Sequence, residues 1–99
     1  MPDALDDAAL REALDALPAW RLDDDALRRD FRFPDFLAAF SFMSAVAMLA
    51  ERHGHHPELR NVYRDVSVAL TTHDAGDRVS ALDVDLARAI DAHLARRDP

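Results

Sequence analysis

Apolar residues recur with helical spacing in three stretches of the chain. The first stretch predicts an amphipathic helix over residues 6–17, which a proline then ends. The second predicts a long helix that Asp35 can cap and that Gly54 can end in the left-handed conformation. In the third, Ser80 and Asp83 stand in capping-box register at a helix start. The expected buried faces are Leu10, Leu14 and Leu17; Phe36, Phe40, Met43, Ala47 and Ala50, widened by Leu37, Val46 and Leu49; and Leu82, Leu86, Ile90 and Leu94.

Alternating apolar and polar residues predict strands between these helices. Residues 20–22 and 26–33 flank a run of aspartates, and we interpret them as two antiparallel strands joined by a turn. Residues 61–72 give the clearest strand signal, and their first residues could form a separate short strand before a turn at Arg64-Asp65. The order of elements is helix, two strands, helix, one or two strands, helix. This order predicts an α+β fold, in which an antiparallel sheet carries helices on one face.

Length and charge narrow the possible functions. Ninety-nine residues predict one domain, residues 1–99, with a modest core that oligomerisation would help to stabilise. The net charge of −7 argues against nucleic acids and anionic membranes as partners. No apolar run approaches the roughly 18 residues of a membrane span. The first residues are acidic, unlike a signal peptide, so we expect a cytoplasmic protein.

Several residue types that support common chemistries are missing or scarce. The sequence has no cysteine and no lysine, which excludes disulfides, thiolate nucleophiles and lysine Schiff bases. Its two glycines, Gly54 and Gly76, are too few for a phosphate-cradling loop or a dinucleotide fingerprint. Trp20, the single tryptophan, is predicted to be structural.

Histidines gather at the ends of the predicted elements. His55 and His56 follow the long helix, and His73 follows the strand of residues 61–72. Imidazoles exchange protons near neutral pH, and the carboxylates of Glu51 and Asp83 are close in sequence, so these residues could form a general acid/base site. Two other interpretations are polar loop residues near a helix terminus and a zinc site that would add His53. The zinc site is disfavoured because the helical i, i+4 spacing of strong zinc motifs is missing.

Four short motifs resemble one family closely. They are His55-His56-Pro57, Asn61-Val62-Tyr63, Thr72-His73 and Asp83, and the resemblance is collinear from Trp20 to His93. Together they are similar to the pterin-4a-carbinolamine dehydratases. The resemblance implies three helices on one face of a four-stranded antiparallel sheet, with subunits assembled into homodimers or homotetramers. It also implies a hydro-lyase that converts 4a-hydroxytetrahydropterin to quinonoid dihydropterin in tetrahydropterin recycling, without a metal, nucleotide or redox cofactor.

The resemblance assigns roles to individual residues. It implies that His55, His56 and His73 are catalytic and contact the substrate. As a hypothesis, His55 and His73 exchange acid and base roles on opposite sides of C4a, and His56 holds the ring or the hydroxyl. Asp83 would support a histidine, and Glu51, with Pro57 and Thr72, would bind the substrate. Alanine at His55 or His73 is expected to reduce dehydration strongly while leaving the fold intact.

Three departures from the family pattern bear on activity, and one of them is Leu82, which precedes Asp83 where relatives often have a charged residue. Leu59 stands where the family usually has an aromatic residue, so an aromatic contact with the pterin would be lost. The loop at Gly76–Ser80 is one residue longer than usual, which affects how Asp83 aligns. These departures leave two alternatives open. One is a catalytically weak relative that acts as a protein-binding or oligomer-stabilising assembly factor. The other is an interaction domain with no ligand.

Overall fold

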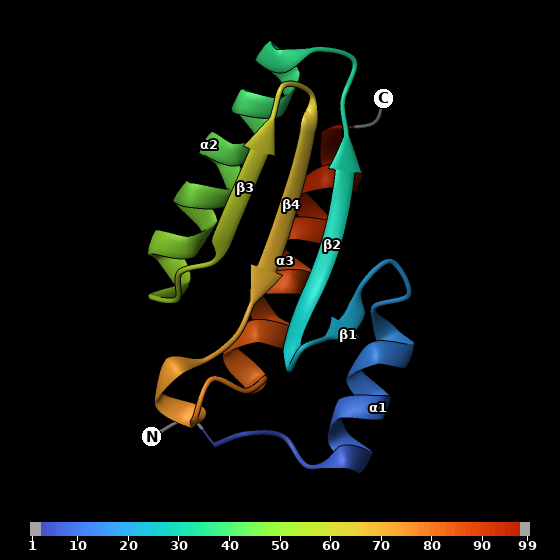
Figure 1. Ribbon diagram of the computed structural model, residues 1–99, viewed down its shortest axis with the longest axis vertical. Helices are drawn as coiled ribbons and strands as arrows, with labels where there is room; N and C mark the ends of the chain where they lie inside the picture. Colours follow the sequence, from blue (N-terminus) through green and yellow to red (C-terminus); the bar gives the residue numbers. More distant parts are fainter. Residues whose placement is uncertain (1–2, 98–99) are drawn as a thin grey trace.

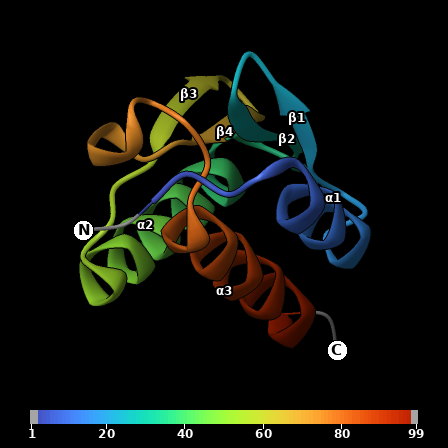
Figure 2. The same ribbon diagram turned by 90° about the horizontal axis from the view of Figure 1, so that it is seen from below.

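The computed structural model describes residues 3–97 and contains one four-stranded sheet. The strand order is β1-β2-β4-β3, and every neighbouring pair is antiparallel. The helices pack on one face of this sheet (Figure 2), as the sequence predicted. None of the helices within the described range is long and apolar enough to cross a membrane. The elements are α1 (Asp7–Ala16), β1 (Arg21–Asp23), β2 (Ala26–Arg32), α2 (Phe36–His53), β3 (Glu58–Val62), β4 (Asp65–Leu70), the short 3₁₀ helix η1 (His73–Ala75) and α3 (Ala81–Arg97).

Aspartate side chains cap the starts of α1 and α2, and the cap of α2 is the one that the sequence predicted. The Asp6 carboxylate accepts a hydrogen bond from the Ala9 amide at 2.8 Å, and Asp35 accepts one from Ala38 at 2.8 Å. A short polar side chain at this position satisfies an amide that the first turn leaves unpaired. Gly54 ends α2 with φ of 61°, which a residue without Cβ adopts at little cost.

The strand predicted over residues 61–72 is divided in two by a tight turn. β3 already begins at Glu58, and β4 begins at Asp65 after a turn in which Tyr63 has φ of 52°. The Asn61 side-chain amide stabilises this turn by donating to the carbonyl oxygens of Tyr63 and Asp65, both at 3.0 Å. The β1–β2 turn has positive φ at both Asp24 and Asp25, which matches the twist of a two-residue hairpin.

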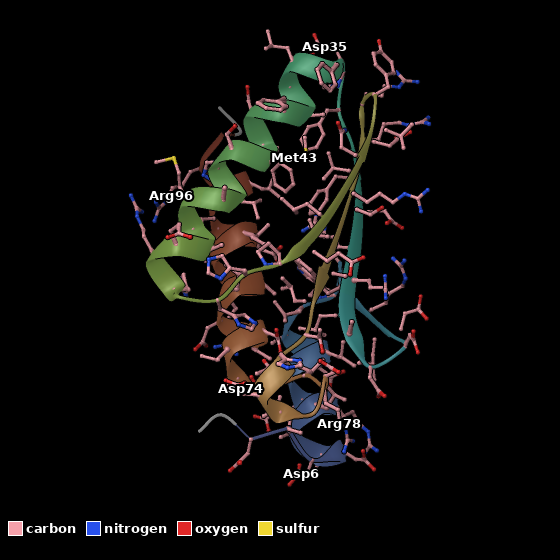
Figure 3. The ribbon with its side chains drawn as sticks, turned by 60° about the vertical axis from the view of Figure 1, so that its left-hand side comes forward. Asp6, Asp35, Met43, Asp74, Arg78 and Arg96 are labelled. Carbon is pink, nitrogen blue, oxygen red and sulfur yellow. The ribbon has the colours of Figure 1, made fainter. Side chains whose placement is uncertain are left out.

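The core lies between the sheet and the helices. Alternate residues of β2 and β4 point into it, and the opposite face of the sheet carries charged side chains (Figure 3). Trp20 is buried as expected, and its indole N–H donates to Asp91 of α3 at 2.9 Å. Arg29, on the inner face of β2, donates to the same Asp91 oxygen at 2.7 Å. The fully buried side chains of the core include Leu27, Phe42, Val46, Val66, Val68, Leu70, Leu86 and Ile90.

The predicted buried face of α2 is confirmed at Val46 and Ala50 and is wrong at most of its other positions. The side chains that enter the core are Ala39, Phe42, Val46 and Ala50. Of the expected face, Met43 and Leu49 are only partly buried, whereas Phe36, Leu37, Phe40 and Ala47 are exposed. The error has a physical cause. This helix is apolar on most of its circumference, so periodicity could not indicate which side meets the sheet. On α3 the expected Leu86 and Ile90 are buried, but Leu82 is only half-buried.

Three chain segments meet at one end of the molecule. In Figure 1 the segment after β4 and the start of α3 lie together below the sheet, and the loop after α2 lies above them on the left. Asp74 marks this end in Figure 3, whereas Asp35 lies at the far end of α2. The fold therefore brings together the three regions in which the sequence placed its histidines and Asp83.

Candidate active site

The end of α2 directs His55 into the protein. The Gly54 amide donates to the Glu51 carbonyl at 3.2 Å, and the His55 amide donates to Ala50 at 3.1 Å. These bonds close the last helical turn with a left-handed residue, so that the chain reverses direction immediately before His55. His55 is consequently buried, 9% exposed, while the next residue, His56, remains on the surface.

Asp83 is the centre of a buried polar network. It is 0% exposed, and its Oδ1 lies 2.5 Å from His55 Nε2. Its Oδ2 accepts from the Thr72 hydroxyl at 2.7 Å and from the Ser80 amide at 2.9 Å. The Ser80 hydroxyl in turn accepts from the Leu82 amide at 3.2 Å and lies 2.6 Å from the Thr72 hydroxyl. Asp83 therefore completes the predicted capping box and at the same time holds the imidazole of His55.

His56 and Glu51 form a second carboxylate–imidazole pair. His56 Nε2 lies 2.8 Å from Glu51 Oε1, and both side chains are exposed. Glu51 occupies the last turn of α2, which brings it beside the loop that carries His56. Glu51, which was expected to bind the substrate directly, thus contacts the neighbouring His56.

His73 and Asp77 form a third pair. His73 Nδ1 lies 3.0 Å from Asp77 Oδ1, and the His73 side chain is 90% exposed. Asp77 reaches back because both it and Gly76 have positive φ, 58° and 77°, which reverses the chain after η1. The pKa of His73 is raised because Asp77 hydrogen-bonds the ring and because Asp77 and Asp74 add negative charge around it.

The three predicted catalytic histidines each have one ring nitrogen close to a carboxylate. A carboxylate in this position fixes the tautomer and orientation of an imidazole, and it stabilises the protonated ring. The pairs are His55 with Asp83, His56 with Glu51 and His73 with Asp77.

Two adjoining cavities lie around these histidines. Cavity A has a volume of about 280 Å³ and cavity B about 380 Å³, and His56, Thr71 and His73 line both. Cavity A adds Gly54, His55, Thr72, Asp74 and Leu82. Cavity B adds Asp24, Ala26, Arg28, Pro57, Glu58, Ala69 and Asp77. The residues common to both cavities form a shared wall, so a ligand that contacts this wall can reach two exposed imidazoles.

Leu59 lies outside both cavities. It is half-buried on β3 and packs against the hydrophobic core. A larger aromatic side chain in that direction would pack first against core residues. The absence of an aromatic residue at this position therefore removes no lining residue from cavity A or cavity B.

Two site residues were not found from the sequence. Thr71 lines both cavities, and Asp77 pairs with His73. The alternation of β4 contained a signal for Thr71, because Ser67 and Ala69 face away from the helices and residue 71 continues that series. The position of Asp77 beside His73 depends on a left-handed backbone conformation within the longer loop. An aspartate in the sequence is only a weak signal for that conformation.

Replacing Asp77 by asparagine is expected to lower the pKa of His73. The substitution removes the negative charge nearest the ring, so the protonated imidazole loses stabilisation. ¹H NMR of the His73 ring protons across pH measures this change. Asp74→Asn is the matched control and should lower the pKa less, because Asp74 acts on His73 through charge alone. An unchanged His73 pKa in Asp77→Asn would show that the pair is not formed in solution.

Comparisons with known proteins identify the family. Residues 3–93 match the family model described as "Pterin 4 alpha carbinolamine dehydratase". A Rhizorhabdus wittichii protein that is provisionally named pterin-4-alpha-carbinolamine dehydratase is 54% identical over 92 residues, covering 91% of this chain and 94% of its own length. A Rhodopseudomonas palustris protein of the same provisional name is 54% identical over 94 residues, covering 93% of this chain and 88% of its own.

A solved structure supports the same assignment. The Brucella melitensis protein described as a transcriptional coactivator/pterin dehydratase has a TM-score of 0.85 and 41% identity, covering 91% of this chain and 97% of its own. Sequence relatives, family model and fold agree over nearly the same residues. The chain belongs to the pterin-4a-carbinolamine dehydratase family.

Proposed function

We propose that the protein is a hydro-lyase that dehydrates 4a-hydroxytetrahydropterin to quinonoid dihydropterin by histidine acid/base catalysis. The observation that carries this proposal is the cleft formed by cavities A and B, where three carboxylate-paired imidazoles come together. Imidazoles have an ordinary pKa of about 6.5, so they can both donate and accept protons at working pH. The reaction needs no more than such groups around one carbon.

The proposed reaction breaks the C4a–O bond and forms a C4a=N5 double bond. The N5 lone pair moves toward C4a as the oxygen leaves. One imidazolium protonates that oxygen, which departs as water, and a neutral imidazole accepts the N5 proton. The products are quinonoid dihydropterin and one water. One imidazole has lost a proton and the other has gained one, so the number of protons on the two rings together is unchanged. Positioned proton transfer of this kind typically contributes about 10²–10⁴-fold to the rate.

The exposure of the three rings supports a different division of roles from the one inferred by resemblance. His56 and His73 are exposed and belong to the shared wall, so they are best placed to exchange protons with a substrate. His55 is buried, contacts cavity A only and has Nε2 held by Asp83, which suits it to orient the substrate. Thr72 is committed to the Asp83 network and supports His55 indirectly.

A coupled assay tests this function in its physiological direction. A pterin-dependent hydroxylase generates the carbinolamine, whose accumulation is followed by absorbance. Catalytic amounts of this protein should abolish the accumulation and increase the rate of quinonoid dihydropterin formation. If the carbinolamine accumulates unchanged in the presence of folded protein, the assembly-factor alternative replaces the enzyme. For either function we propose a cytoplasmic location.

We further propose that the protein forms homodimers or homotetramers through the exposed face of α2. Leu37 is 74% exposed, Phe40 55% and Met48 62%, and all three lie on one helix. Large apolar side chains grouped on a surface typically mark an interface. A second copy of the chain is the simplest occupant, because its own α2 presents the same apolar side chains.

A charge on this face should separate the subunits. Phe40→Glu is expected to give the mass of a monomer, because pairing would bury an unpaired carboxylate. Light scattering coupled to size exclusion measures the mass. Leu22→Glu, at an exposed leucine on β1, is the matched control and should keep the wild-type mass. A monomeric wild type at all concentrations would refute the proposed interface.

A further inference from the structure

A short segment before α1, residues 3–5, lies against the loop of residues 76–80 that leads into α3. The Leu5 amide donates to the Val79 carbonyl at 2.9 Å, and the two segments also form an antiparallel bridge. The Leu5 side chain packs against the hydrophobic core. In Figure 1 the segment passes below this loop before the chain enters α1. The loop is therefore fixed on one side by a part of the chain that is distant in sequence.

The end of β4 fixes the same loop on its other side. The Thr72 amide donates to the Arg78 carbonyl at 2.9 Å, and these two residues form a second antiparallel bridge. Successive carbonyl groups of an extended chain point in opposite directions, so Arg78 bonds Thr72 while Val79 bonds Leu5. Val79 itself is buried. This part of the loop thus lies between two chain segments, as the middle strand of a small sheet does.

The residues on either side of this stretch each support a histidine. Asp77 precedes it and lies 3.0 Å from His73 Nδ1. Ser80 ends it and donates its amide to Asp83, which contacts the ring of His55. Asp77 has φ of 58°, a conformation that a residue with a side chain keeps only where its surroundings enforce it. The position of the loop therefore affects two of the three carboxylate–imidazole pairs.

We propose that residues 3–5 position the loop so that Asp77 stays against His73, which prepares this histidine for proton transfer, and that Leu5 is the positioning residue. This inference rests on the proposed dehydratase function. Residues 3–5 line neither cavity A nor cavity B, so they act through the loop and not on the substrate. Without the bond from Leu5, the loop can move away from the end of β4. The His73 ring then loses the carboxylate that orients it and stabilises its protonated form.

Leu5→Pro tests the hydrogen bond, because proline has no amide N–H to donate. The pKa of His73, measured by ¹H NMR of its ring protons, should fall toward its ordinary value as Asp77 leaves the ring. The value of kcat/KM should fall by about two- to tenfold, the range expected for the loss of one hydrogen bond. Leu5→Ile keeps the amide and an apolar side chain, so it should retain the wild-type pKa and rate.

Three further variants separate positioning from stability. Leu5→Ala weakens the packing of the segment but keeps its amide, so it should lower the His73 pKa less than Leu5→Pro does. Leu10→Ala is the matched control, because Leu10 is a partly buried leucine of α1 that also packs against the core. It should lower the melting temperature and leave the His73 pKa and kcat/KM unchanged. Added to Asp77→Asn, Leu5→Pro should lower the His73 pKa no further, because both changes remove the same contact.

The pKa of His73 and the rate together decide the inference. A wild-type His73 pKa in folded Leu5→Pro would overturn it, whatever the melting temperature. A lowered pKa with wild-type kcat/KM would also overturn it, because the position of the loop would then not affect turnover. A folded but inactive wild type would refute the dehydratase, whereas a lowered His73 pKa in Leu5→Pro would still support the positioning of Asp77 by residues 3–5.

Discussion

The His56→Ala/His73→Ala variant is expected to keep the wild-type fold and to lose dehydration by about 10²-fold or more. Each imidazole is proposed to transfer one of the two protons, and each such group typically contributes about 10²–10⁴-fold. Both side chains are exposed, so their removal opens no cavity in the core. Loss of rate without loss of stability is therefore the expected signature.

The loss in the double variant should be smaller than the product of the two single losses. Groups that act in one concerted step are not additive, because removing either leaves the other with little to do. His53→Ala is the matched control, since His53 is an exposed imidazole at the end of α2 that lines neither cavity. It should turn over like the wild type. Wild-type rates in His56→Ala/His73→Ala would exclude the proposed pair of proton carriers.

Asp83→Ala is expected to lower the free energy of unfolding by about 3 kcal/mol. The substitution leaves buried His55 without its partner. Removing one member of a buried pair is strongly destabilising, because the other member stays buried and unpaired. It also removes the acceptor of the Ser80 amide at the start of α3. Domains of this size have about 5–15 kcal/mol in total, so the melting temperature should fall by roughly 10 °C or more.

Asp85→Ala provides the matched control for this loss. Asp85 is exposed on the same helix, two residues further on, and its removal should change the free energy of unfolding by less than about 0.5 kcal/mol. Urea denaturation followed by circular dichroism compares the two variants. Equal stabilities for Asp83→Ala and Asp85→Ala would mean that the buried network does not stabilise the fold.

The same network changes what is expected of His55→Ala. From the sequence, His55→Ala was expected to reduce dehydration and to leave the fold intact. In the structure His55 is buried against Asp83, so alanine would leave that carboxylate without its imidazole and would also reduce stability. A loss of rate in His55→Ala would therefore mix two causes, and His56 and His73 are the cleaner sites for testing catalysis.

Local chemistry explains why much of the fold could be predicted. Asp35 and Gly54 act on amides or backbone angles within a few residues of themselves, so their effect can be inferred from adjacent sequence. The capping box of Ser80 and Asp83 is equally local. The histidine motifs and Asp83 are separated in sequence. That they belong to one site was predicted from the resemblance to one family.

What could not be predicted depends on contacts between distant residues. Several exposed residues of α2, among them Phe36, Leu37 and Phe40, were expected to be buried. The buried side is chosen by the sheet and α3, which the spacing of apolar residues on α2 does not reveal. The pairing of His73 with Asp77 requires positive φ in a loop. That Thr71 lines both cavities could be seen only in the folded chain.

Stopped-flow absorbance with purified 4a-hydroxytetrahydropterin tests the central claim most directly. Wild type, His53→Ala and His56→Ala/His73→Ala are compared at equal concentration, after circular dichroism has confirmed equal folding. Wild type and His53→Ala should accelerate dehydration over buffer in proportion to protein concentration, and the double variant should not rise measurably above buffer. No acceleration by folded wild type, or equal acceleration by all three proteins, would contradict the claim that this cleft dehydrates pterins.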